Sequence, residues 1–120
     1  MHGKTPITER RIVIAAALSA ALAIAAGAFG AHSAPSPIAA DWLRTGGFYQ
    51  LIHGVAGLWL AARHPRIAAT LLFGAAWFAL TLYAMALGAP RWFGALTPIG
   101  GMVMIGGWLA LAWINYKPLK

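Results

Sequence analysis

The sequence predicts an all-α membrane protein: an antiparallel four-helix transmembrane bundle that forms a single domain over residues 1–120. The composition is 61% hydrophobic and only 9% charged, whereas soluble domains are about one quarter charged. Four apolar stretches are each close to the length of about 20 residues that crosses a bilayer as a helix. None of the four contains Asp, Glu, Lys or Arg, and none alternates with the period of a strand.

The first span is predicted over residues 12–31, IVIAAALSAALAIAAGAFGA. It follows Arg10 and Arg11, and the segment around Ala34 resembles a signal-peptidase site. The apolar run is longer than the core of about 7–15 residues that a signal peptide has, and three further spans follow. We therefore expect this segment to remain in the protein as a span.

The other three spans follow at short intervals, at residues 46–62, 67–87 and 97–116. A proline-rich loop at residues 33–37, with Asp41 and Arg44 beyond it, is expected to cover one end of the bundle. Thr97 is expected to cap the fourth helix, because Pro98 follows it at a position that suits the first residue of a helix.

The placement of basic residues predicts the orientation in the membrane. One side of the membrane would hold both chain termini and the middle loop, with Lys4, Arg10, Arg11, Arg63, Arg66, Lys117 and Lys120. The other side would hold only Arg44 and Arg91. Cytoplasmic loops are enriched in Lys and Arg, so both termini are expected in the cytoplasm of a plasma (inner) membrane protein.

The composition also bears on partners and chemistry. The net charge is +7, but the basic residues are scattered between apolar segments, as topology signals are, so nucleic acid is not an expected partner. Cysteine is absent, which excludes disulfides and thiolate nucleophiles. We predict no catalytic residue, metal or cofactor. The expected partners are the lipid bilayer and another membrane protein or a second copy of the chain.

Small residues recur every three or four positions along each span, so they share one face of each helix. Because membrane helices associate by close packing, these faces are expected to meet in a compact bundle. The predicted packing positions are Gly27, Gly30, Gly54, Gly57, Gly74, Gly100 and Gly107.

The stretch FYQLIHG, residues 48–54, places polar groups inside the second span. Gln50 lies on the small-residue face, with His53 as its neighbour on the helix and Tyr49 one turn before His53. These side chains are expected to face the bundle or its boundary, away from lipid, in the outer half. The candidate polar site comprises His32, Gln50, His53, Tyr83 and Thr97.

Two interpretations of this cluster stay open. The polar groups could join the helices through hydrogen bonds worth about 1 kcal/mol or less each, in a non-enzymatic accessory, structural or assembly protein. Alternatively, His32, Gln50, His53 and Tyr83 could bind a small ligand, a metal or a lipid headgroup from the outer side, since ionisable groups within membranes often mark functional sites.

Three motifs occur in order along the chain: GAFGAH at residues 27–32, YQ-x-x-H at residues 49–53 and TPIGG at residues 97–101. Together they resemble domain of unknown function 423, a family of YgdD-like and transmembrane protein 256-like small integral membrane proteins. The resemblance implies a small multi-pass protein, in bacteria of the plasma membrane, and it carries over no catalytic residue. The chain departs from the family pattern at Gly46–Gly47 and just before Leu82–Tyr83.

Overall fold

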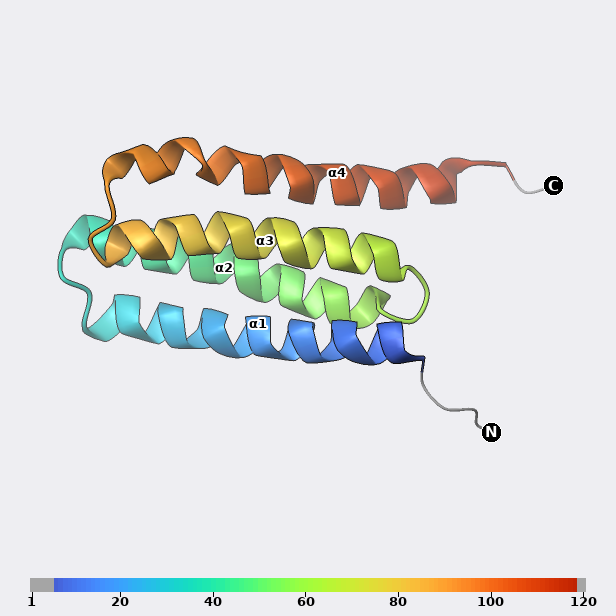
Figure 1. Ribbon diagram of the computed structural model, residues 1–120, viewed down its shortest axis with the longest axis horizontal. Helices are drawn as coiled ribbons and strands as arrows, with labels where there is room; N and C mark the ends of the chain where they lie inside the picture. The colour runs from blue at the N-terminus through green and yellow to red at the C-terminus, as the bar shows by residue number, and fades with distance from the viewer. Residues whose placement is uncertain (1–5, 119–120) are drawn as a thin grey trace.

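The computed structural model describes residues 6–118, and these form an all-helical chain. The long helices are α1 (Ile7–His32), α2 (Pro37–Leu60), α3 (Pro65–Ala86) and α4 (Thr97–Tyr116), and a short 3₁₀ helix, η1 (Arg91–Ala95), precedes α4. The helices lie lengthwise and alternate in direction, so α1 begins and α4 ends at the same end of the molecule (Figure 1). We call this the termini end, which also holds the α2–α3 connection, and we call the opposite one the two-loop end.

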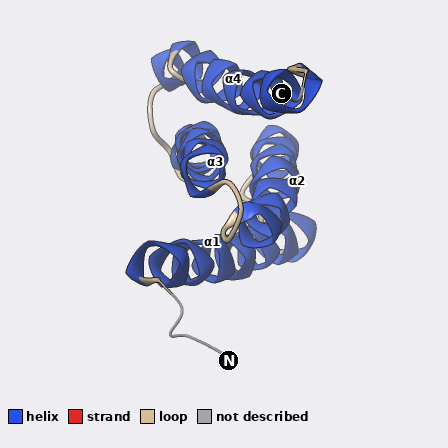
Figure 2. Ribbon diagram, turned by 90° about the vertical axis from the view of Figure 1, so that its right-hand side faces the viewer, coloured by secondary structure: helices blue, strands red, loops and turns tan. Residues whose placement is uncertain are grey.

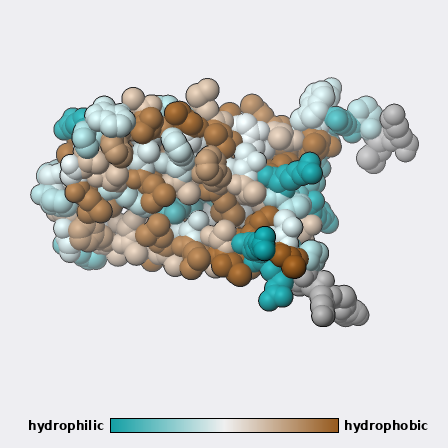
Figure 3. Space-filling model, in the orientation of Figure 1, coloured by the Kyte–Doolittle hydropathy of each residue, from teal (hydrophilic) through white to brown (hydrophobic). Residues whose placement is uncertain are grey.

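Three segments of the described chain are long and apolar enough to cross a membrane: α1, α3 and the segment Arg91–Tyr116, which includes α4. The helix α2 is long enough but carries more polar and small residues, Gln50 and His53 among them. On the face shown in Figure 3, hydrophobic residues cover the length of the molecule, and hydrophilic ones lie mainly toward its ends. This distribution suits a protein whose sides face lipid.

The second helix is longer than the predicted span, because it begins at Pro37 rather than at Gly46. The hydroxyl of Ser36 accepts a hydrogen bond of 3.1 Å from the backbone N–H of Ala39, and Pro37 suits the first turn. Asp41 and Arg44 therefore lie on the helix, where they form an exposed ion pair of 3.2 Å, and not in the expected covering loop. The prediction was based on the apolar run, which marks only the part of a helix that suits lipid. It therefore could not include the more polar first turns of α2.

The helix α3 is the central one. It packs along α2 and α4 and over a shorter length against α1, while α1 packs along α2. In the described chain the backbone of α4 approaches α3 and η1 but not α1 or α2. Viewed end-on, α1 forms one layer, α2 and α3 a second, and α4 a third (Figure 2). This arrangement is more open than the compact bundle that the small-residue faces predict.

Most of the predicted packing glycines lie at these helix contacts. A methyl group added to any of six of them would lie 2.6–3.2 Å from an atom of a neighbouring helix: Gly30, Gly54, Gly57, Gly74, Gly100 and Gly107. A methyl group on Gly27 would meet nothing within 4 Å. The closest approach is between α3 and α4, where the methyl position of Gly100 lies 2.6 Å from the carbonyl oxygen of Gly74.

The chain leaves α3 through Gly88, whose φ of +110° lies in the region that side chains disfavour. The backbone N–H of Gly88 donates to the carbonyl of Met85 at 3.1 Å, and that of Ala89 donates to Ala84 at 2.9 Å. These bonds satisfy carbonyl groups that the end of a helix leaves without partners. The turn directs the chain into η1 and then back along α3 as α4.

Candidate functional site

Gln50 and Tyr83 form a buried pair between α2 and α3. The phenolic O–H of Tyr83 donates to Oε1 of Gln50 at 2.7 Å, and only 2% of Gln50 is exposed. Side chains on a helix point toward its N-terminus, so Tyr83 reaches from near the end of α3 toward the middle of α2. Its ring passes over Gly46, where an added methyl group would lie 2.7 Å from ring atom Cε1. The glycine makes room for the phenol to reach the amide.

His53 and Trp108 form a second pair, between α2 and α4. The indole N–H of Trp108 donates to Nε2 of His53 at 2.9 Å, and Nδ1 of His53 lies 2.7 Å from the carbonyl oxygen of Tyr49. Because an indole can only donate, Nε2 must be the acceptor. The ring is therefore neutral, with its proton on Nδ1 and donated to the backbone. Both ring nitrogens are occupied.

Thr81 and Thr97 form a third pair, between α3 and the start of α4. Their hydroxyl oxygens are 2.7 Å apart, and Thr81 also donates to the carbonyl of Phe78 on its own helix at 2.8 Å. Next to them, the indole N–H of Trp77 donates to the carbonyl of Leu96 at 2.8 Å. These bonds fasten the beginning of α4 to α3.

The predicted capping role of Thr97 is wrong. Thr97 is the first residue of α4, the capping position belongs to Leu96, and no side chain caps this helix. The hydroxyl of Thr97 instead faces Thr81 and lies 3.4 Å from the carbonyl of Phe93. The Thr-Pro pattern identifies the helix start but cannot show that a hydroxyl on a neighbouring helix competes for the side chain.

His32 lies apart from the other candidate residues. It is the exposed last residue of α1, at the two-loop end. His53 is buried about 24 Å along the axis of α2 from Pro37, at about 1.5 Å per residue. His53 is seven residues from Leu60, about 10 Å from the end of α2, so it lies in the half of this helix toward the termini end, whereas the outer half was expected. Within residues 6–118 no three His, Cys, Asp or Glu residues lie close enough to hold a metal ion.

Tyr49 is 40% exposed, so this residue lies at the boundary of the bundle and is not buried with Gln50. Its ring packs edge-on against Phe78 of α3, with the centroids 5.0 Å apart. Tyr49, His53, Phe78, Met104 and Trp108 line a hollow of about 360 Å³ between α2 and α4. The His53–Trp108 pair thus borders an open groove, while the Gln50–Tyr83 pair is enclosed.

Sequence reasoning missed the role of Trp108. A tryptophan in an apolar helix is commonly an interfacial anchor, but a buried or lipid-level indole N–H needs an acceptor. The sequence does show that Trp108 needs a hydrogen-bond acceptor and that His53 can provide one. It could not select the pair, because the register between α2 and α4 depends on how both pack on α3.

The charged side chains lie at the two ends of the described chain. At the two-loop end Arg44 pairs with Asp41, and the guanidinium of Arg91 lies 5.4 Å from the centre of the Trp42 ring. The termini end carries the remaining basic groups among the described residues: Arg10, Arg11, Arg63, Arg66 and Lys117. Lys4 and Lys120, which the orientation argument also used, lie outside the described residues.

Long apolar helices whose polar side chains pair with one another define a helical integral membrane protein. The chain belongs to the family described as Protein of unknown function (DUF423), whose model matches residues 26–101. The resemblance drawn from the three motifs is thereby confirmed.

Relatives extend the match over most of the chain. A UPF0382 membrane protein of Staphylococcus saprophyticus is 35% identical over 88% of this chain and 96% of its own length. The UPF0382 inner membrane protein YgdD of Escherichia coli K12 is 36% identical over 85% of this chain and 86% of its own length. A UPF0382 membrane protein of Haemophilus influenzae is 34% identical over 84% of this chain and 90% of its own length. No solved structure matches the chain.

Proposed function

We propose that this chain is a non-enzymatic protein of the inner membrane that crosses the bilayer four times and serves as an accessory or assembly component. The observation that carries the proposal is the pairing of its intramembrane polar groups with one another. Gln50 with Tyr83, His53 with Trp108 and Thr81 with Thr97 each join two helices. Polar side chains that bond to one another across two helices stabilise the helix contact, as interhelical hydrogen bonds in membranes are expected to do.

The four-span topology is supported by the path of the chain. Both α1 and α3 are apolar enough to span, and α2 connects the two-loop end of one to the termini end of the other (Figure 1). Its 24 residues extend about 36 Å, enough for a hydrocarbon core of about 30 Å. The concentration of basic groups at the termini end favours that end in the cytoplasm. The relative YgdD is named an inner membrane protein.

The topology can be tested by cysteine labelling, because the chain has no cysteine of its own. Ser33→Cys places a thiol at the two-loop end and His64→Cys places one at the termini end. In right-side-out vesicles, a membrane-impermeant maleimide should label position 33 at once and position 64 only after the membrane is opened. Labelling of both from outside, or the reverse order, would contradict the proposed orientation.

The accessory role can be tested by isolating the tagged protein in a mild detergent and measuring the molecular mass and chain composition of the complex. A fixed stoichiometry with another membrane chain, or with a second copy, is expected. On α4, Gly106 is exposed and a methyl group there would meet nothing within 4 Å, so Gly106→Leu should weaken a contact made through α4 without disturbing the fold. Ala28→Leu, at an exposed position of α1, is the control. A lone monomer under all extraction conditions would argue against the role.

A ligand site is the second candidate function, and the hollow beside His53 and Trp108 is the observation that favours it. A small molecule seated there would contact the open edge of the His53–Trp108 pair. The purified protein should then carry a stoichiometric compound or metal, visible by mass spectrometry, elemental analysis or absorbance, and lost in His53→Ala. Protein that is free of any such compound when gently purified would leave the accessory role as the better explanation.

A further inference from the structure

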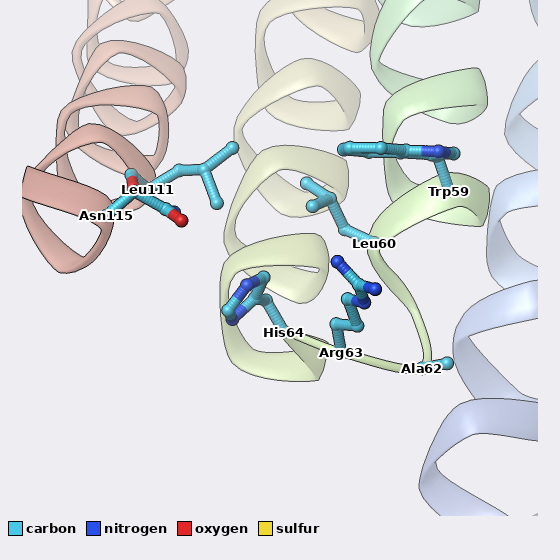
Figure 4. A pocket seen from close by; sticks show the side chains of 7 residues that line it. All are labelled: Trp59, Leu60, Ala62, Arg63, His64, Leu111 and Asn115. Atoms are coloured by element: carbon cyan, nitrogen blue, oxygen red, sulfur yellow. The ribbon is translucent and has the colours of Figure 1, made fainter. Parts of the chain in front are cut away.

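A large hollow lies at the termini end, between the α2–α3 connection and the last turns of α4. Its volume is about 550 Å³, within the range of about 300–1,000 Å³ of ligand sites. It exists because α4 packs on α3 but its backbone does not approach α2. Figure 4 shows Leu111 and Asn115 of α4 on one side and Trp59 and Arg63 on the other.

The hollow has an apolar inner part and a basic mouth. Trp59, Leu60 and Leu111 supply the apolar lining, and Arg63 and His64 lie at the mouth, where the α2–α3 connection meets α3 (Figure 4). Trp59 is 76% exposed and lies next to the last residue of α2. Tryptophan is enriched at the boundary between hydrocarbon and headgroups, and the end of a spanning helix lies near that boundary. The gradient from apolar to basic follows the direction in which a lipid lies in the bilayer.

A second hollow, of about 340 Å³, adjoins the mouth and adds Arg66 and the first turn of α3. The first backbone N–H groups of a helix have no acceptor within it, and they carry the positive end of the helix dipole. In α3 the first residue, Pro65, has no N–H, and the N–H of Ala68 donates to His64 at 2.9 Å, so the N–H groups of Arg66 and Ile67 are the ones left. A phosphate group placed here would meet these two groups together with the guanidinium groups, a combination that favours anions.

Neither arginine forms an ion pair within the described chain. Of the two acidic residues, Asp41 pairs with Arg44 at the opposite end, and Glu9, in the first turn of α1 at the termini end, forms no ion pair with a residue of 6–118. The charge at the mouth of the hollow is therefore open to an anion from outside the chain. Basic pockets between membrane helices are recognised sites for anionic lipid headgroups.

We propose that this hollow binds one anionic phospholipid, with its phosphate at Arg63 and Arg66 and the upper part of an acyl chain against Trp59 and Leu111. The rest of the acyl chain continues along the open side of the helices, toward the separate hollow that His53 and Trp108 line about 9 Å farther along α2 from Trp59. The proposal goes beyond the accessory role and does not depend on which side of the membrane the termini occupy.

The test is native mass spectrometry of the full chain with added phosphatidylglycerol or phosphatidylethanolamine of the same acyl chains. Phosphatidylglycerol should bind at least fivefold more tightly. Arg63→Gln should weaken it about fivefold, the effect of one basic group near a membrane surface, and Arg66→Gln should act similarly if Arg63→Gln does not fold. Arg10→Gln, an exposed position on α1 outside both hollows, is the control for general surface charge.

The apolar part is tested separately, by filling it. Asn115→Trp introduces a large ring into the hollow, whereas Ala112→Trp adds the same ring to an exposed position of α4 that does not line it. Only Asn115→Trp should reduce phosphatidylglycerol binding. Equal binding of the two lipids, an equal loss in Arg10→Gln, or a dimer that only Asn115→Trp dissociates would each overturn the proposal, the last by assigning the hollow to a second copy of the chain.

Discussion

Trp108 of α4 and His53 of α2 are joined by a hydrogen bond of 2.9 Å although the backbones of their two helices do not approach each other. The bond therefore bridges an open groove and is not a by-product of close helix packing. It links α4 directly to α2, whose relative position otherwise depends on how both helices pack on α3. It also fixes the tautomer of His53, because the indole can only donate.

Trp108→Phe should loosen α4. The substitution keeps an aromatic ring but leaves Nε2 of His53 without its donor, and one such bond between membrane helices contributes about 1 kcal/mol. We expect a lower midpoint of thermal unfolding in detergent, followed by circular dichroism. Trp113→Phe, an exposed position of the same helix with no hydrogen bond from its indole to the described chain, is the control. Equal midpoints for the two variants would show that the bridge adds nothing to stability.

Tyr83→Phe should also lower stability, by up to about 1 kcal/mol, because it removes the donor to Oε1 of Gln50 inside the protein. Gln50→Leu should have a similar effect. The double variant should cost less than the sum of the two, since each single change already breaks the same bond. Unfolding midpoints of the four proteins of this cycle measure the coupling. Strict additivity would mean that the two side chains act independently.

Thr81→Val should weaken the attachment of α4 at the two-loop end by a few tenths of a kcal/mol to about 1 kcal/mol. Valine keeps the shape of the side chain but removes the hydroxyl that faces Thr97. Thr70→Val is a matched control on the same helix, because Thr70 donates only to the carbonyl of Arg66 one turn before it. Hydrogen exchange of the first turns of α4 should rise in the first variant and stay unchanged in the second.

The helical, membrane-embedded character of the chain follows from its composition and its four apolar runs, and so does the inward direction of Gln50 and His53. Amides and imidazoles are costly in hydrocarbon, so they turn toward other helices. The partners of these groups could not be predicted in the same way. The bond from Tyr83 depends on its ring crossing Gly46, and that crossing depends on the register of α3 against α2.

Several of the wrong or incomplete expectations concern the ends of helices. The early start of α2 and the side-chain role of Thr97 are both set by polar contacts at helix ends, which hydropathy does not describe. The exposed position of His32 follows from the same ends, because α1 stops where the chain turns. Periodicity identifies which face of a helix is buried, but the pairing of faces is settled by the three-dimensional packing order, with α3 in the centre.

Gly100→Ala gives the strongest test of that packing order. A methyl group at Gly100 would lie 2.6 Å from both the carbonyl oxygen of Gly74 and the backbone nitrogen of Phe78, so α4 would have to move away from α3. Backbone atoms cannot yield as a side chain does, and overpacking of this kind costs about 1–3 kcal/mol. We expect a clear drop in the thermal midpoint.

Gly101→Ala is the neighbouring control, since its methyl group would meet nothing within 4 Å, and alanine favours the helix by about 1 kcal/mol over glycine. The two variants should therefore shift stability in opposite directions, and a shift of the same sign and size in both would mean that the Gly74–Gly100 contact does not hold α4 in place.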